Sequence, residues 1–206
     1  MDERPHRGQS LVGAYLFIEG AEAAKGARSR CREAFQTLFR NAGVTRTPRF
    51  VPCGGRGRTF DKFKTAHKSC SGFVAMLIDS EDPVVDAEKT WAHLKSRDGW
   101  DHPVGATDEQ VLLMTTSMET RIAFDRAALK QFFGSGLQEN ALPPLFEIEK
   151  RDRHDVLKKL EQATRDCKPP YRKGDVSFRI LATLDPVVLN QLPSFARTIR
   201  ILKAKL

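Results

Sequence analysis

Short apolar runs alternate with stretches of helical periodicity through the first half of the chain. The runs are too short for buried helices, and glycine, proline or acidic residues close them. They predict four buried strands, at residues 13–20, 49–53, 73–80 and 110–117. Between them, apolar residues at helical spacing predict helices over 21–41, about 60–69 and about 85–96. The last of these helices is expected to use Val85, Trp91 and Leu94 as its apolar face.

This alternation of strands and helices predicts an α/β fold with a mostly parallel central sheet of about four strands. The remaining chain shows mainly helical patterns, and Asp125 and Gly134 are expected to begin and end one of them. The expected helices cover 125–133, 152–164, 177–184 and the stretch after Pro193. We therefore divide the chain into a disordered tail at 1–10, a core at 11–125 and a mainly helical extension at 126–206 that packs on the core.

The net charge of the chain bears on its binding partner rather than on its fold. The 206 residues include 34 Lys and Arg against 26 Asp and Glu, which gives a net charge of +8. Such a basic surface favours an anionic partner, most commonly nucleic acid, although a basic protein without such a partner is the simpler alternative. No apolar stretch approaches the ~18 residues of a membrane span, and residues 1–10 lack the apolar segment of a signal peptide. We therefore expect a cytoplasmic protein without a membrane partner.

Acidic, basic and glycine residues stand where the predicted strands end. The carboxyl ends of parallel strands meet at one edge of a sheet, which is where ligands bind in such folds. Carboxylates that converge need a cation or shared protons, and a hard divalent ion such as Mg²⁺ accepts oxygen ligands. Glycine amides can approach a phosphate, and arginine can pair with it bidentately. The residues expected at this edge are Glu19, Gly20, Gly54, Gly55, Arg56, Asp79, Glu81 and Glu119.

Each of these residues also has a purely structural interpretation. Glu19 can stabilise the start of a helix through its dipole, and Asp79 and Asp82 can be turn or capping residues. Glu119 fits a solvated helix surface, the turn GGRGR fits a flexible loop, and Lys173 fits an ordinary surface lysine. The functional interpretation depends on the combination and on the assumed order of the strands.

At these residues the chain resembles the Toprim (topoisomerase–primase) domain. The resemblance is carried by a strand that ends in Glu-Gly, YLFIEG with Glu19, and by a later strand that ends in an acidic D-x-D-like motif, MLIDSED with Asp79 and Glu81. The second acid of that motif is a glutamate here rather than an aspartate. The chain is expected to share the Toprim-like α/β fold.

Beyond this core the chain is similar to a bacterial Toprim-like family of unknown function. Its members are often encoded beside ATPases that resemble the OLD (overcoming lysogenisation defect) nucleases, and they are suspected of phage defence. The similarity spans about residues 14–186, through stretches such as PCGGR, FDKFKTA, WAHLKSRDGWD and PYRKGDVSFRILATLDP. This family tends to carry an aromatic residue where the present chain has Arg121.

The resemblance implies a metal-dependent nuclease or a related phosphotransferase, with an ATPase as its protein partner. It implies that Glu19 is a metal ligand or general acid–base and that Asp79 and Glu81 hold Mg²⁺ or Mn²⁺. Glu119 and Lys173 are the candidates for the further acid and the late lysine of enzymes similar to OLD nucleases. Lys173 would stabilise the charged transition state, and Arg56 is expected to share the binding of the scissile phosphate.

Two other functions compatible with the sequence stay open. The first is a non-catalytic subunit with a Toprim-like fold that binds nucleic acid or an ATPase. The second is a metal-dependent phosphatase or nucleotidyl hydrolase that acts on small substrates. The basic charge argues against the second, because extended backbones gain most from distributed Lys and Arg.

Overall fold

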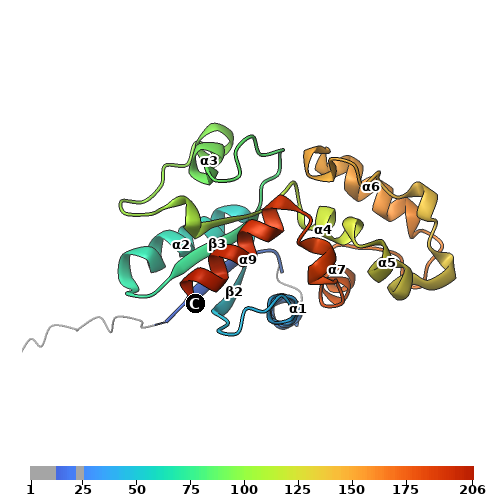
Figure 1. The fold of residues 1–206 in the computed structure, drawn as a ribbon, viewed down its shortest axis with the longest axis horizontal. Helices are drawn as coiled ribbons and strands as arrows, with labels where there is room; N and C mark the ends of the chain where they lie inside the picture. The colour runs from blue at the N-terminus through green and yellow to red at the C-terminus, as the bar shows by residue number, and fades with distance from the viewer. Residues whose placement is uncertain (1–12, 22–25) are drawn as a thin grey trace, which may run out of the picture.

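The computed structural model describes residues 13–21 and 26–206 of the chain. Within these residues, four parallel strands form one sheet in the order β2-β1-β3-β4 (Figure 1). The strands are β1 (Tyr15–Glu19), β2 (Arg49–Gly54), β3 (Val74–Asp79) and β4 (Val111–Met114). The predicted α/β fold with a parallel central sheet is confirmed. The disordered tail expected at 1–10 lies outside the described residues.

Helices make up most of the remaining described chain (Figure 1). The α-helices are α1 (Ala27–Asn41), α2 (Arg56–Ser69), α3 (Thr90–Asp98), α4 (Met118–Phe124), α5 (Arg126–Phe133), α6 (Arg153–Ala163), α7 (Asp175–Leu181), α8 (Pro186–Leu189) and α9 (Pro193–Lys205). Short 3₁₀ turns are η1 (Asp108–Gln110), η2 (Gly134–Gly136), η3 (Glu139–Ala141) and η4 (Ile148–Lys150). None of the described helices is long and apolar enough to cross a membrane.

Helices bury both faces of the sheet, which explains why the strands read as apolar runs rather than as alternating patterns. Leu16 and Ile18 of β1 pack in one apolar cluster, whereas Phe17 between them packs in a second. The first cluster includes residues of α1 and α9, and the second includes residues of α2 and α3. Successive side chains of each strand therefore point to opposite helical layers.

The C-terminal extension shares the first cluster with the sheet, so it packs directly on the core. Arg197 of α9 is nearly buried and donates hydrogen bonds to the carbonyl oxygens of Val111 and Asp108, at 3.0 and 2.9 Å. These bonds join α9 to the start of β4. Helices α4–α7 gather at one end of the molecule, beyond the carboxyl ends of the strands (Figure 1). Of these helices, α4 and α7 contribute residues to the site described below.

The predicted helices differ from the structure at several points; for example, α1 begins at Ala27 rather than at residue 21, and α7 ends at Leu181 rather than at residue 184. Helix α2 begins at Arg56, not at about 60, because the extended Gly55 serves as its N-cap and the last three residues of GGRGR are helical. Helix α3 begins at Thr90, and Val85 is fully exposed rather than part of an apolar face. Helix α4 was not predicted, since its seven residues are too few for a clear periodic pattern. Trp91 and Leu94 are buried as expected.

The start of β3 contains a close backbone contact that can be tested. A Cβ added at Gly72 would lie 2.0 Å from the carbonyl oxygen of Gly13, so an alanine there forces the backbone next to β1 and β3 to shift. We expect Gly72→Ala to lower the free energy of unfolding by about 1–3 kcal/mol. The melting temperature should fall by roughly 2–4 °C for each kcal/mol in a chain of this size, as thermal denaturation would measure.

The matched control is Gly57→Ala, also a glycine-to-alanine change. Gly57 is exposed within α2, and nothing lies within 4 Å of an added Cβ. This variant should be neutral or more stable, by roughly 0.5–1 kcal/mol, because alanine favours the helix. Equal melting temperatures for the two variants would contradict the close contact.

Candidate functional site

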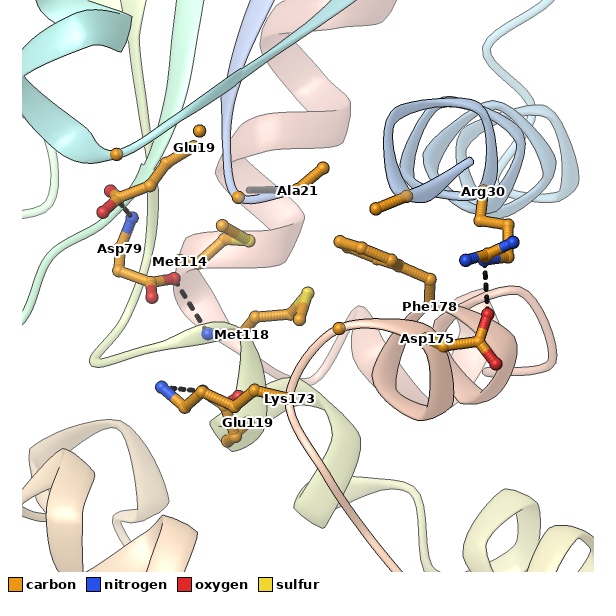
Figure 2. Close-up of a pocket in the computed structure, with 15 residues that line it drawn as sticks. Glu19, Ala21, Arg30, Asp79, Met114, Met118, Glu119, Lys173, Asp175 and Phe178 are labelled. Atoms are coloured by element: carbon orange, nitrogen blue, oxygen red, sulfur yellow. Dashed lines mark hydrogen bonds and ion pairs between the residues drawn. The ribbon is translucent and has the colours of Figure 1, made fainter. Parts of the chain in front are cut away.

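A pocket of about 570 Å³ opens at the carboxyl edge of the sheet. The strand ends contribute one wall, and α1, α4, α7 and the loop before α7 contribute the rest (Figure 2). Its lining residues include Glu19, Gly20, Gly54, Gly55, Asp79, Glu119 and Lys173. The structure thus brings seven of the nine predicted site residues to one cavity. Glu81 and Arg56 lie outside its lining.

Asp79 is the residue that connects the elements of this pocket. Parallel pairing of β1 with β3 places the two strand ends side by side, and the Asp79 backbone N–H donates to Oε2 of Glu19 at 3.2 Å. The side chain of Asp79 accepts a hydrogen bond at Oδ1 from the backbone N–H of Met118, at 2.9 Å. Met118 begins α4, so the same interaction fixes the helix that carries Glu119. Figure 2 shows these contacts in sequence across the pocket.

Glu119 is buried, with only 2% of its surface exposed, and is not the solvated helix residue of the simpler interpretation. Its Oε1 accepts a hydrogen bond from the Tyr171 hydroxyl at 2.9 Å, and its Oε2 lies 3.5 Å from Nζ of Lys173. Both partners come from the loop that precedes α7. Burial raises the pKa of Tyr171 well above its ordinary value, and the nearby Glu119 adds to this, so the phenol stays a donor. Tyr171 was not predicted, although it lies between the prolines and the basic pair of PPYRKG.

The carboxylates of the pocket destabilise one another. Burial raises the pKa of Asp79 well above its ordinary value, and the charges of Glu119 and Glu19 raise it further. Burial also raises the pKa of Glu19, against the opposing effect of Arg56, while Glu81 lies near enough to add to the increase. An acid with a raised pKa is one whose charged form lacks compensation. The site therefore favours protons or a cation.

The carboxylates of the pocket are the possible ligands for the expected divalent metal. No three His, Cys, Asp or Glu side chains of the described residues come together in an arrangement that could hold a metal ion. The chemistry of the pocket nevertheless fits a hard cation, because Glu19, Asp79 and Glu119 all line it and all are oxygen donors. Their mutual repulsion is what a divalent cation would remove.

Glu81 and Asp82 do not lie where the sequence predicted them. Strand β3 ends at Asp79, and Glu81 adopts a left-handed backbone with φ 71°, so it does not share the direction of Asp79. The Glu81 carboxylate instead pairs with Arg97, at 3.0 Å, and with Arg153. Asp82 was a candidate cap for the next helix, but its carboxylate also pairs with Arg97, at 2.9 Å, and α3 has no side-chain cap at its start.

Arg56 supports the site from outside the pocket. Its guanidinium makes a bidentate pair with Asp98, at 3.1 and 2.7 Å, and lies 5.2 Å from the ring centroid of Trp100. It also donates to the carbonyl oxygen of Asp79 and lies 3.6 Å from Oε2 of Glu19. The expected phosphate contact would have to displace these partners. The structure instead assigns Arg56 to positioning Glu19 and the end of β3.

In two of the three predicted phosphate-binding glycines, the backbone N–H already donates a hydrogen bond within the protein. The N–H of Gly20 donates to the carbonyl oxygen of Gly54 at 2.7 Å, and the N–H of Gly54 donates back to Gly20 at 2.9 Å. These bonds fasten the ends of β1 and β2 to each other. Gly55 remains at the pocket, as the N-cap of α2.

A second polar pair lines the side of the pocket opposite the acids. Arg30 of α1 forms an ion pair with Asp175 at the start of α7, next to Phe178 (Figure 2). Neither residue was predicted as part of the site. Arg30 belongs to a basic segment of α1 that the sequence does show, with Arg28 and Arg32.

Comparison with known proteins identifies a family. No curated protein and no solved structure matches the chain significantly. A family model described as a domain of unknown function (DUF4276) matches residues 18–203, which is most of the chain and includes all the pocket residues described above. The chain therefore belongs to the DUF4276 family, whose function is unknown.

Proposed function

We propose that this protein is a Mg²⁺- or Mn²⁺-dependent nuclease that hydrolyses phosphodiesters of DNA or RNA at a Toprim-type acidic site. The observation that carries the proposal is the convergence of Glu19, Asp79, Glu119 and Lys173 on one pocket at the carboxyl edge of a parallel sheet. Three converging carboxylates beside a lysine provide the two requirements of phosphoryl transfer, which are a cation site and a positive charge for the phosphate.

The contacts of each pocket residue indicate its role in the proposed reaction. Glu19, Asp79 and Glu119 would hold the cation, which when bound activates water and offsets charge on the scissile phosphate. The Tyr171 hydroxyl fixes Oε1 of Glu119 and leaves Oε2 facing Lys173. The Lys173 side chain is 58% exposed, so its ammonium group can turn from Glu119 to a substrate phosphate.

The proposal leaves Glu81 out of the metal ligands. Arg97 and Arg153 already neutralise its carboxylate, so a cation would have to compete with two guanidinium groups. Glu81 acts on the site through its charge, which raises the pKa of Glu19.

The resemblance to the Toprim-like family extends the proposal to a biological setting. The protein would be the cytoplasmic effector of a bacterial defence system and would work with an ATPase partner. The net charge of +8 supports a nucleic-acid substrate.

The second candidate function is a non-catalytic subunit that binds nucleic acid or an ATPase. One observation favours it: the acids of the described residues do not converge on a single metal-binding point. The two candidates differ in whether any activity depends on Asp79 and on a metal.

Loss of the pocket carboxylates should abolish cleavage. We expect Asp79→Asn and Glu119→Gln to lower the rate by a factor of about 10² or more, the usual scale for removing a group that acts in the transition state. Purified protein would be assayed on plasmid DNA, single-stranded DNA and RNA with Mn²⁺ or Mg²⁺, and with EDTA.

Glu161→Gln provides a matched control, because Glu161 is an exposed acid on α6, away from the pocket lining. It should cleave at the wild-type rate. Cleavage by Asp79→Asn as fast as by the control would overturn the nuclease proposal, and the second candidate would then account for the site.

Removal of the Asp79 charge should stabilise the metal-free protein. The folded state raises the pKa of Asp79, so its charge opposes folding above the ordinary carboxyl pKa of ~3.9 and has no effect well below it. In EDTA at neutral pH, Asp79→Asn should therefore melt at a higher temperature than wild type. The difference should shrink as the pH falls towards the ordinary carboxyl pKa.

The same melting assay tests metal binding directly. Mn²⁺ should raise the melting temperature of the wild type, by about 2.7 kcal/mol of stability at a concentration of about 100 Kd, but not that of Asp79→Asn. Asp82→Asn is the control, since its exposed carboxylate pairs with Arg97 and should give no gain in EDTA. In EDTA at neutral pH, a melting temperature of Asp79→Asn below that of wild type would contradict the repulsion between Asp79 and the other pocket carboxylates.

A further inference from the structure

The floor of the pocket has the same sign of charge as a phosphate. Glu19, Asp79 and Glu119 line it, and within the described residues their ion pairs are those of Lys173 with Glu119 and of Arg56 with Glu19. A small anion entering the cavity would therefore meet repulsion before any cation compensates it. Substrate affinity has to come from positive charge around the mouth.

One basic group surrounds the β2 side of the mouth, and we call it the β2 rim: Arg28, Arg58 and Lys62. All three are exposed. Nη1 of Arg58 lies 3.9 Å from the point where a Cβ on the pocket residue Gly54 would stand. Arg28 and Lys62 also lie near Cys53, at the end of β2. Burial raises the pKa of the Cys53 thiol, and the charges of these two residues oppose that increase.

The cations of the β2 rim are not used inside the protein. None of the three forms an ion pair with a carboxylate of the described chain. Other exposed lysines do have such partners, for example Lys95 with Asp101 at 2.8 Å. The positive charge of the β2 rim is therefore available to a ligand at the pocket mouth.

A second basic group lies across the pocket. Arg172 and Lys173 are adjacent and exposed on the loop before α7, and Lys173 reaches Glu119 of α4, the helix that follows β4. In the sheet order β2-β1-β3-β4, β2 and β4 are the two outer strands. The two basic groups thus flank the acidic floor, separated by roughly 14 Å, since neighbouring strands lie about 4.8 Å apart.

We propose that the site takes an extended polynucleotide whose sugar–phosphate backbone crosses the carboxyl edge of the sheet from the β2 rim to Arg172 and Lys173. One phosphodiester then lies over the acidic floor, and its neighbours are held by the cations on either side. A mononucleotide or small phosphate ester reaches only one group, whereas a chain of phosphates engages both. This inference rests on the proposed nuclease function and adds the path that the nucleic-acid backbone takes across the site.

The experiment measures binding without cleavage. Fluorescence anisotropy of the full chain in EDTA, with labelled single-stranded DNA, duplex DNA and single-stranded RNA, gives affinity as a function of salt. For wild type, log K should fall steeply with log salt, because each phosphate contact releases counterions. The triple variant Arg28→Gln/Arg58→Gln/Lys62→Gln should reduce the magnitude of the slope of log K against log salt by about 2–3. It should also weaken binding at least about tenfold.

The matched control removes the same charge from the opposite edge of the sheet. Arg46 precedes β2, Lys68 lies in the last turn of α2, and Lys203 lies in the last turn of α9. All three are exposed. The triple variant Arg46→Gln/Lys68→Gln/Lys203→Gln should bind all three probes within about twofold of wild type, because contacts rather than net charge set the salt dependence.

Three results would overturn the inference. They are equal weakening in the two triple variants, competition by inorganic phosphate or a mononucleotide as strong as by an oligonucleotide, and no binding of any probe by wild type. The probe that loses most affinity in the rim variant identifies DNA or RNA as the substrate. Because binding is measured in EDTA, these outcomes are independent of the cleavage assay on Asp79→Asn, which tests the nuclease function itself.

Discussion

The site depends on the two hydrogen bonds that Asp79 makes at the end of β3. Its backbone N–H holds Glu19 of the neighbouring strand, and its side chain holds the first residue of α4. Strand pairing alone would align β1 with β3, but it would not place α4 or Glu119. The same two bonds bring the carboxylates of Glu19, Asp79 and Glu119 into one pocket, and the repulsion that raises the pKa of Asp79 opposes folding. A fold rarely retains such a cost except where a ligand relieves it.

The surrounding residues compensate this cost without filling the pocket. Arg56, held by Asp98, approaches Glu19 from behind, and Tyr171 binds Glu119 from the opposite side. Arg121 is fully buried, and burial lowers its pKa to about 10 against the opposing charges of Glu149 and Asp79. Its guanidinium lies 5.3 Å from the ring centroid of Phe195 in the core. A buried charge of the core, Arg121, therefore interacts with a carboxylate of the site, Asp79.

The sequence predicted the four strands and the clustering of Glu19, Asp79 and Glu119, because buried parallel strands leave clear apolar runs and their ends meet at one edge. Lys173 was a candidate only through the resemblance. It failed where a side chain's direction depends on a single backbone angle or on a distant partner. Glu81 leaves the pocket through one left-handed residue. Arg56 is taken up by Asp98, 42 positions away, and Tyr171 reaches Glu119 across 52 positions. No local pattern encodes such contacts.

The distribution of charge explains why a basic protein can have an acidic centre. Cations placed within the pocket would neutralise the carboxylates and remove their affinity for a divalent ion. Cations placed at the mouth leave that affinity intact and attract a phosphate chain through its counterion release. Short phosphate esters meet the repulsive floor without gaining contacts on both sides, so the same arrangement selects for length. Under the proposed function, the net charge of +8 and the acidic pocket would be two parts of one mechanism for recognising an extended polyanion.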